Sequence, residues 1–360
     1  MVNTGVDLHN RAMTRHQIIP RCFVVGLIAI SLYMDLGSPL IVPLLFLLVV
    51  PFEKLFPRHE QKLRRPLIGL DLAYALSQPI LAAATLAAGF VVAIVSLFWL
   101  PGMLVAPLVS PLGSTAQLIF GFFVMDALIY WVHRWSHEVP FLWRFHSVHH
   151  SIETMDWISA FRNHPIDGLI IAPPVAFMLA AGFSLETTSI LTVLQIATGI
   201  FLHANVRWRW KPLQRIIITP DFHHWHHANE QDAINSNYSV FLPLWDIAFG
   251  TWFMPPDRRP AIYGVDEHVP STMAAQMVYP FRGLKNPTWM LRHPIRGARY
   301  TLAGLQRGIG QIVASLRRPR RPFHTPSAPP PPPTFIPPPP PRWATPTSLR
   351  HGSHEQVTIG

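Results

Sequence analysis

The feature that most constrains the fold of this chain is a set of histidine clusters between residues 126 and 227, a stretch that holds 11 of the 19 histidines. On an α-helix, side chains three or four residues apart share one face. His133 and His137 have that spacing, so we expect them to point the same way. Two triplets repeat it with offsets of three and four residues: His146, His149 and His150, then His223, His226 and His227.

These clusters predict a metal centre that holds two ions. Together they offer eight imidazoles, and His203 would add a ninth. A mononuclear zinc site uses about four ligands, so nine are too many for one ion. Imidazole binds Zn, Cu, Fe and Ni, and spacing alone does not choose among them. A single histidine beside an apolar segment is more often a packing residue, but three matched clusters favour metal binding. His224 lies outside the spacing and is left out of the ligand set.

Long apolar segments predict an integral membrane protein. The chain is 49% hydrophobic and only 13% charged, with a mean hydropathy of +0.25, values that separate it from soluble globular proteins. We expect an all-α fold, a polytopic membrane helical bundle with helical hairpins. Hairpins are predicted at 18–52, broken at 37–39, and at 168–204, turning near 182–184. Single spans are predicted at 70–99 and 115–132, joined by an outer turn at 101–113.

Basic residues predict the orientation. Five of them lie in the linker 53–66, and four more follow the last apolar segment at 207–215. The positive-inside rule puts both stretches in the cytoplasm, which places the histidine clusters on the cytoplasmic face. The net charge of +10 therefore indicates a membrane surface as partner, and no nucleic acid. The single cysteine, Cys22, excludes an intramolecular disulfide and a thiolate-ligated iron–sulfur cluster.

Four regions are predicted along the chain. Residues 1–66 hold a polar segment, the first hairpin and the basic linker, and residues 67–255 form the membrane catalytic domain. Residues 256–318 form a basic interfacial segment, in which 295–316 have the apolar spacing of an amphipathic helix on the inner membrane surface. Residues 319–360 carry two runs of five prolines and are expected to be a disordered tail.

A polar stripe crosses the third apolar segment. Asp126, Tyr130, His133 and His137 follow one another at steps of four, three and four residues. Ionisable groups within membrane segments are expensive, so Asp126 is a functional candidate. It is expected either to accept a hydrogen bond from a ligand imidazole or to make a hydrogen bond that packs two helices. Asp221 and Asp246 are further candidates to compensate the charge of the metal ions.

The motifs together resemble the fatty acid hydroxylase and sterol desaturase superfamily, whose members are membrane di-iron oxygenases with histidine boxes. The resemblance covers roughly residues 70–255 and departs from the family at His224, where arginine is common. A run at 162–165 resembles one found in part of the family and would place His164 near the metal without making it a firm ligand. The matching elements are Asp126 to His137, Trp143 to His150, His203 to Asn205, Thr219 to His227, Asn237-Tyr238, Trp245-Asp246 and Phe249 to Thr251.

The resemblance implies an enzyme that uses two Fe ions and O2 to hydroxylate or desaturate a C–H bond of a lipid. The nine histidines would bind the metal, and Asp126, Tyr130, Asn205 and Asp246 would complete the site. The lipid would come from the bilayer, and the electrons from a separate electron-transfer protein. Two alternatives stay open: a membrane zinc hydrolase, although the chain has no His-Glu-x-x-His motif, and a metal transporter.

Overall fold

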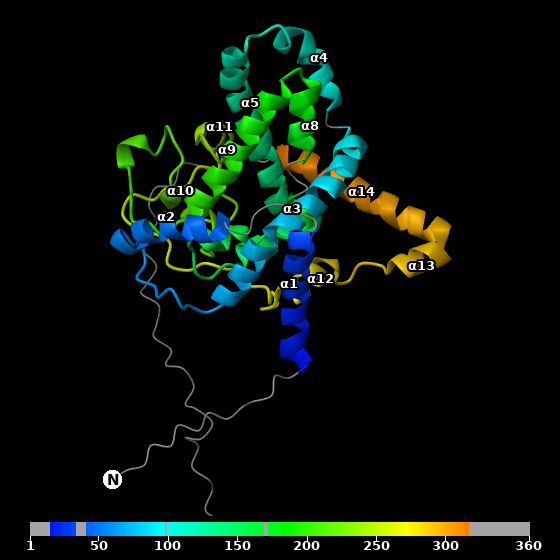
Figure 1. Cartoon of the computed structure of the whole chain (residues 1–360). Coiled ribbons are helices and arrows are strands. Elements are labelled where there is room, and N and C mark those ends of the chain that lie inside the picture. The colour runs from blue at the N-terminus through cyan, green and yellow to red at the C-terminus, as the bar shows by residue number, and fades with distance from the viewer. Residues whose placement is uncertain (1–14, 34–40, 98, 169–171, 317–360) are drawn as a thin grey trace, which may run out of the picture. The chain divides into compact units, whose positions relative to one another are not determined.

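The computed structural model describes residues 15–33, 41–97, 99–168 and 172–316 (Figure 1). These residues form helices and loops without strands, apart from isolated bridges between Pro57 and Val206 and between Ala228 and Tyr263. The all-α prediction is therefore confirmed. The expected break at 37–39 and the expected tail at 319–360 lie outside the described residues.

Three of the described helices are long and apolar enough to cross a membrane: α3 (Ile68–Ser96), α5 (Ser114–Glu138) and α9 (Leu185–His203). They confirm the spans predicted from the apolar segments and identify an integral, multi-pass membrane protein. The shorter helix α8 (Ala172–Ala180) precedes α9 and packs against α3, α4 and α5. Gly182 turns the chain between α8 and α9 with a φ of 85°, a conformation that favours glycine.

The prediction of an outer turn at 101–113 was wrong for most of these residues, because they form a helix. Helix α4 (Leu100–Val109) begins with a proline in its first turn, where the missing N–H costs nothing. It lies at the top of Figure 1 and packs on α8. A Cβ atom at Gly102 would lie 2.8 Å from the carbonyl oxygen of Phe177, so this glycine lets the two helices approach closely.

The two N-terminal helices run in different directions in Figure 1. Helix α1 (Arg15–Tyr33) packs against α3 and α12 (Met273–Val278). Helix α2 (Ile41–Leu55) buries Val42 and Val50 against Ala75 of α3 and Trp157. Both helices therefore pack on the end of α3 that is nearest to its N-terminus.

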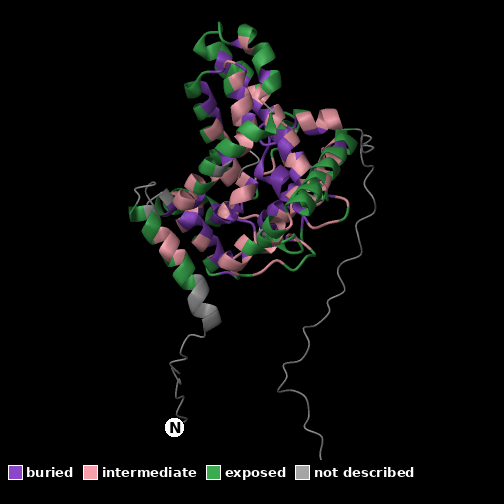
Figure 2. Cartoon of the chain, turned by 90° about the vertical axis from the view of Figure 1, so that its right-hand side faces the viewer, coloured by how far each residue is buried: buried purple, intermediate pink, exposed green. Residues whose placement is uncertain are grey.

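Short helices beyond the ends of the spans carry most of the histidines. Figure 2 shows the buried residues gathered in this part, whereas the upper ends of the long helices are largely exposed. The core here joins Ile129 of α5, Leu202 of α9 and Trp225 of α10. The elements are α6 (Pro140–His150), η1 (Trp157–Phe161), α7 (Pro165–Gly168), η3 (Lys211–Leu213), α10 (Pro220–His226), α11 (Leu244–Phe249) and η4 (Tyr279–Phe281).

The last described helices are α13 (Pro287–Arg292) and α14 (Pro294–Leu316). Helix α14 confirms the amphipathic helix expected at 295–316, and its Leu302, Leu305 and Ile309 are exposed. Near its end, the carbonyl oxygen of Ser315 accepts a hydrogen bond from Arg134 of α5 at 3.3 Å. Helix α14 is thereby tied to the helix that carries the first two histidines.

Candidate metal centre

The chain positions the histidines at helix ends that meet in one place. His133 and His137 lie in the last turns of α5, and Pro140 starts α6 immediately afterwards. His203 is the last residue of α9. Helix α10 starts at Pro220, another proline suited to a first helical turn. The histidines therefore lie either at the ends of the long helices α5 and α9 or on the short helices α6 and α10 and the residue that follows α10.

The nine predicted ligands separate into two groups, and every one of them belongs to a group. Within each group, one ring nitrogen per histidine lies within 4.8 Å of all the others. The rings of His150 and His227 stack with centroids 4.3 Å apart and join the two groups. The first group holds His133, His137, His146, His150 and His226, and the second holds His149, His203, His223 and His227.

Backbone carbonyls determine which ring nitrogen carries the hydrogen in several of the histidines. The Nδ1 atom of His133 lies 2.7 Å from the carbonyl oxygen of Tyr238. In the second group, Nδ1 of His203 lies 2.7 Å from the carbonyl oxygen of Gly199, and Nδ1 of His149 lies 3.2 Å from that of Arg162. A carbonyl oxygen only accepts, so Nδ1 must carry the hydrogen in each ring, which leaves a lone pair on Nε2.

The lone pairs face one another, which is the strongest sign of a cation site. The Nε2 atoms of His149 and His203 are 3.2 Å apart. Two lone pairs at that distance repel unless a cation lies between them. Ligand nitrogens about 2.1 Å from one ion would be about 3.0–3.4 Å apart at octahedral or tetrahedral angles. The Nε2 atoms of His137 and His146 are buried without a hydrogen-bond partner, so the donor set fits metal ions.

Burial keeps these rings neutral. Loss of solvation, added to the repulsion of neighbouring histidines, lowers the pKa of His150 and His227 well below 6.5. The pKa of His149 and of His226 falls in the same way. A neutral imidazole is the form that binds a metal. The pocket therefore holds its ligands ready for binding at neutral pH.

Sequence reasoning missed Asp167, whose carboxylate contacts a ligand directly. Its oxygens lie 3.0 and 3.1 Å from Nδ1 of His146. A carboxylate on the second nitrogen of a ligand histidine fixes the ring and raises its basicity. Asp167 lies on α7, three residues after His164. The family-like run at 162–165 was the signal that could have drawn attention to it.

Asp126 was expected either to accept a hydrogen bond from a ligand imidazole or to make one that packs two helices, and the structure pairs it with no ligand imidazole. Its carboxylate accepts from the backbone N–H groups of Phe241 and Leu242 and from the indole of Trp245. Asp246 accepts from the N–H groups of Tyr238 and Ser239 and from the hydroxyl of Thr251. Both carboxylates therefore hold the loop at 238–243, whose Tyr238 carbonyl accepts from His133.

The remaining candidates also contact neighbours of the ligands rather than the ligands themselves. The hydroxyl of Tyr130 lies 3.0 Å from that of Thr251. The amide of Asn205 binds the backbone N–H and carbonyl of His59. Asp221 forms buried ion pairs with Arg58 and Arg209. These contacts hold the linker, α10 and the loop after it against the histidine helices.

The two histidines between residues 126 and 227 that are outside the ligand set have other partners. His224 binds the hydroxyl of Tyr263 at 3.0 Å and the carbonyl oxygen of Ala204 at 3.2 Å. His164 lies 3.2 Å from the carbonyl oxygen of Met277. Neither belongs to one of the two groups, which agrees with leaving His224 out.

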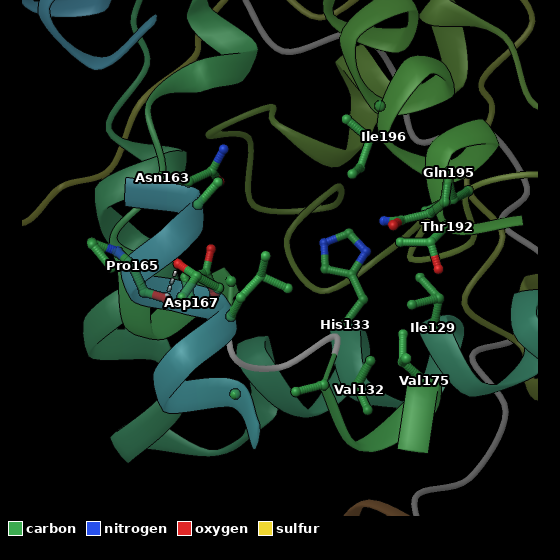
Figure 3. Close-up of a pocket in the computed structure, with 18 of the residues that line it drawn as sticks. Ile129, Val132, His133, Asn163, Pro165, Asp167, Val175, Thr192, Gln195 and Ile196 are labelled. Atoms are coloured by element: carbon green, nitrogen blue, oxygen red, sulfur yellow. Dashed lines mark hydrogen bonds between the residues drawn. The ribbon is translucent and has the colours of Figure 1, made fainter. Parts of the chain in front are cut away.

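A cavity of about 1030 Å³ opens directly onto the histidines (Figure 3). Its walls come from α3, α5, α8 and α9 and are mostly apolar. At one end it reaches His133 and His146 of the first group and His149, His203 and His223 of the second. Both groups are therefore accessible from a space at the depth of the membrane spans. That space is of the size typical of sites for small ligands.

The sequence pattern of the fatty acid hydroxylase family matches residues 118–251. The chain is 33% identical over 166 residues to ornithine lipid hydroxylase OlsE of Rhizobium tropici, which covers 46% of this chain and 50% of that protein. It is 29% identical over 147 residues to alkylglycerol monooxygenase of Danio rerio, covering 40% and 32%. It is 30% identical over 150 residues to sphingolipid C4-hydroxylase sur2 of Schizosaccharomyces pombe, covering 40% and 50%.

The matched region thus spans half or less of the length of these relatives. No solved structure matches the chain. The nine histidines of the two groups run from His133 to His227, so all of them lie within the matched residues. Residues 118–251, which hold both histidine groups, are thus similar to the fatty acid hydroxylase family.

Proposed function

We propose that this protein is a membrane di-iron oxidoreductase that uses O2 to hydroxylate or desaturate a C–H bond of a lipid. The observation that carries the proposal is the cavity at membrane depth that ends at both histidine groups. A chain of a bilayer lipid could enter between α3 and α9 and present a carbon to the metal centre. Similarity to three lipid-oxidising relatives supports the same reaction class.

Iron is the metal that suits this reaction, because it changes oxidation state and zinc does not. When bound, the two ions would supply the oxidising power, which is a property of the metal rather than of the protein. The nine histidines would hold them, and the apolar walls would exclude water and orient the lipid chain. Asp167 would keep the ring of His146 in place through its hydrogen bond to Nδ1.

The overall reaction requires an electron donor. Hydroxylation by O2 consumes two electrons and two protons and yields an alcohol and one water, whereas desaturation yields an alkene and two waters. The lipid itself supplies the remaining electrons in each case. We propose that a separate electron-transfer protein supplies the other two, and that it docks on the face where the histidines lie.

That face is proposed to be cytoplasmic. The basic residues predicted to be inside lie near the histidine end of the spans, and several are exposed in the structure: Lys54, Lys62, Arg64, Arg207, Lys211 and Arg215. Positive charge at the ends of membrane spans favours the cytoplasmic side. Others, such as Arg58 and Arg65, form buried ion pairs that stabilise the fold.

Asp126, Tyr130, Asn205 and Asp246 are proposed to act as positioning residues. Their hydrogen bonds hold the loop at 238–243 and the linker, and that loop in turn orients His133. They would affect the reaction through the metal ligands rather than by touching the lipid.

The test is a single-turnover assay with the purified full chain, ferrous iron, a chemical reductant, membrane lipid extract and O2 labelled with heavy oxygen. We expect a lipid product that carries one labelled oxygen, or one that has lost two hydrogens, and that is missing without O2. A hydrolysed lipid formed without O2 would instead support the zinc hydrolase.

A further inference from the structure

Gln195 lies on the face of α9 that lines the cavity. Thr192, Gly199 and His203 line the same space, at the three- and four-residue steps of one helix face. Gln195 precedes His203 by eight residues, which is about 12 Å along the helix axis. In Figure 3 the amide of Gln195 points into the cavity, toward the side where the ring of His133 lies.

The amide oxygen of Gln195 has an unmet hydrogen bond. It is buried and has no partner among the described residues. Two other polar side chains around the cavity already have partners: the hydroxyl of Thr192 donates to the carbonyl of Thr188, and that of Thr85 to the carbonyl of Pro165. A buried acceptor without a partner costs about 1–3 kcal/mol. A hydrogen bond from a bound molecule would remove that cost.

We propose that Gln195 determines substrate specificity by accepting a hydrogen bond from a hydroxyl or amide N–H of the bound lipid. The inference rests on the proposed function, in which this cavity receives the lipid. It narrows the substrate class to long-chain lipids that carry such a donor within their apolar part. The hydrogen bond would fix how far the chain advances toward the histidines, and so which carbon faces the metal centre.

The rest of the cavity fits a site with one polar contact for the lipid and apolar walls for its chain. The cavity walls also include Leu86 and Phe90 of α3 and Leu179 of α8, whose side chains form no hydrogen bonds. A plain alkyl chain would fill the same space and leave the amide oxygen of Gln195 unpaired. Sites that contain a buried polar group discriminate strongly against ligands that leave it without a partner.

The experiment compares two probes that differ by one hydrogen-bond donor: a long-chain secondary amide with alkyl groups on both sides, and its N-methyl derivative. The full chain, purified in detergent and kept free of iron, is incubated with equal amounts of both. The amount of each that stays bound is measured by mass spectrometry. We expect the wild type to retain the secondary amide about 10-fold better, equivalent to about 1.4 kcal/mol.

Gln195→Leu removes the amide at similar volume and is expected to abolish the preference. Gln195→Met has the same length and no amide oxygen, and it gives a second reading if the leucine variant fails to fold. The matched control is Thr198→Val, one helical turn away on α9 and outside the residues that line the cavity. It should keep the 10-fold preference.

Equal retention of the two probes by the wild type would overturn the proposal, as would a preference that persists in both Gln195 variants. No metal, reductant or O2 takes part in this experiment. A failure of the oxygenase proposal would therefore appear in the labelled-O2 assay and leave the binding preference intact.

Discussion

His149 of α6 and His203 of α9, 54 positions apart in the sequence, direct their Nε2 atoms at each other across 3.2 Å. Each ring donates from Nδ1 to a backbone carbonyl, at Arg162 and Gly199 respectively. The folded chain therefore holds two lone pairs in contact, an arrangement that a bound cation would stabilise. Metal binding should accordingly stabilise the folded protein.

Substitution of Asp167 tests whether its carboxylate, which contacts the ligand His146, increases the affinity for the metal. Asp167→Asn keeps the size of the side chain and removes the charge that faces Nδ1 of His146. Loss of such a partner typically lowers metal affinity or activity about 10–100-fold, and titration with a competing chelator measures it. Asp257→Asn, an exposed position, is the control. Equal chelator titrations for both variants would show that Asp167 does not support the metal.

Asp126 is predicted to act through the loop that it holds. Asp126→Asn removes the charge that accepts from Phe241 and Leu242, and hydrogen bonds to charged groups are worth about 1.5–3 kcal/mol. We expect a lower midpoint of thermal unfolding together with reduced iron occupancy, because the loop also orients His133. Leu128, which is off the polar stripe, provides the control with Leu128→Ile. Unchanged iron occupancy with lowered stability would restrict Asp126 to packing.

Glu53 predicts a pH dependence of stability. Burial raises its pKa to about 7 from 4.5, although the N–H groups of Asn205 and Trp157 donate to it. Between those values the folded chain keeps a proton that the unfolded chain has lost. The free energy of unfolding should therefore fall as pH rises from 4.5 to 7, by up to roughly 3 kcal/mol. Thermal unfolding across this range should show a flatter profile for Glu53→Gln; an identical profile would contradict the assignment.

Removal of the C-terminal tail is predicted to be harmless to the metal centre. Residues 319–360 lack apolar periodicity, and the contact from Arg134 reaches Ser315, which precedes them. Truncation after Arg318 should leave membrane insertion and metal content unchanged, as measured by membrane fractionation and elemental analysis. Loss of metal on truncation would mean that the tail contributes to the site.

The sequence predicted which histidines would meet, but not how they would divide. Spacing by three and four residues placed His223, His226 and His227 on one helix face, yet His226 joins the first group and the other two join the second. One face of a helix is broad enough to serve two ions. The division follows from the packing of α10 on α9, which also brings the ring of His226 against that of His133. Asp167 escaped notice because its partner His146 lies on another helix, 21 positions away.

The roles of Asp126 and Asp246 were also beyond the sequence. A polar stripe on a helix shows that Asp126 shares a face with His133, but not that N–H groups of the loop at 238–243 donate to its carboxylate. Long apolar segments predicted the three spans, because burial in lipid depends mainly on composition, and apolar spacing predicted the helix α14. The helix α4 was missed because its prolines and glycine were taken as signals of a turn.

The central claim is that the two histidine groups bind two iron ions, and metal analysis of the purified full chain tests it most directly. We predict about two iron atoms per chain in the wild type. His149→Ala should remove one from the second group, and His226→Ala should remove one from the first. Leu128→Ile should keep both. One tightly bound ion per chain, unaffected by either histidine substitution, would contradict the account.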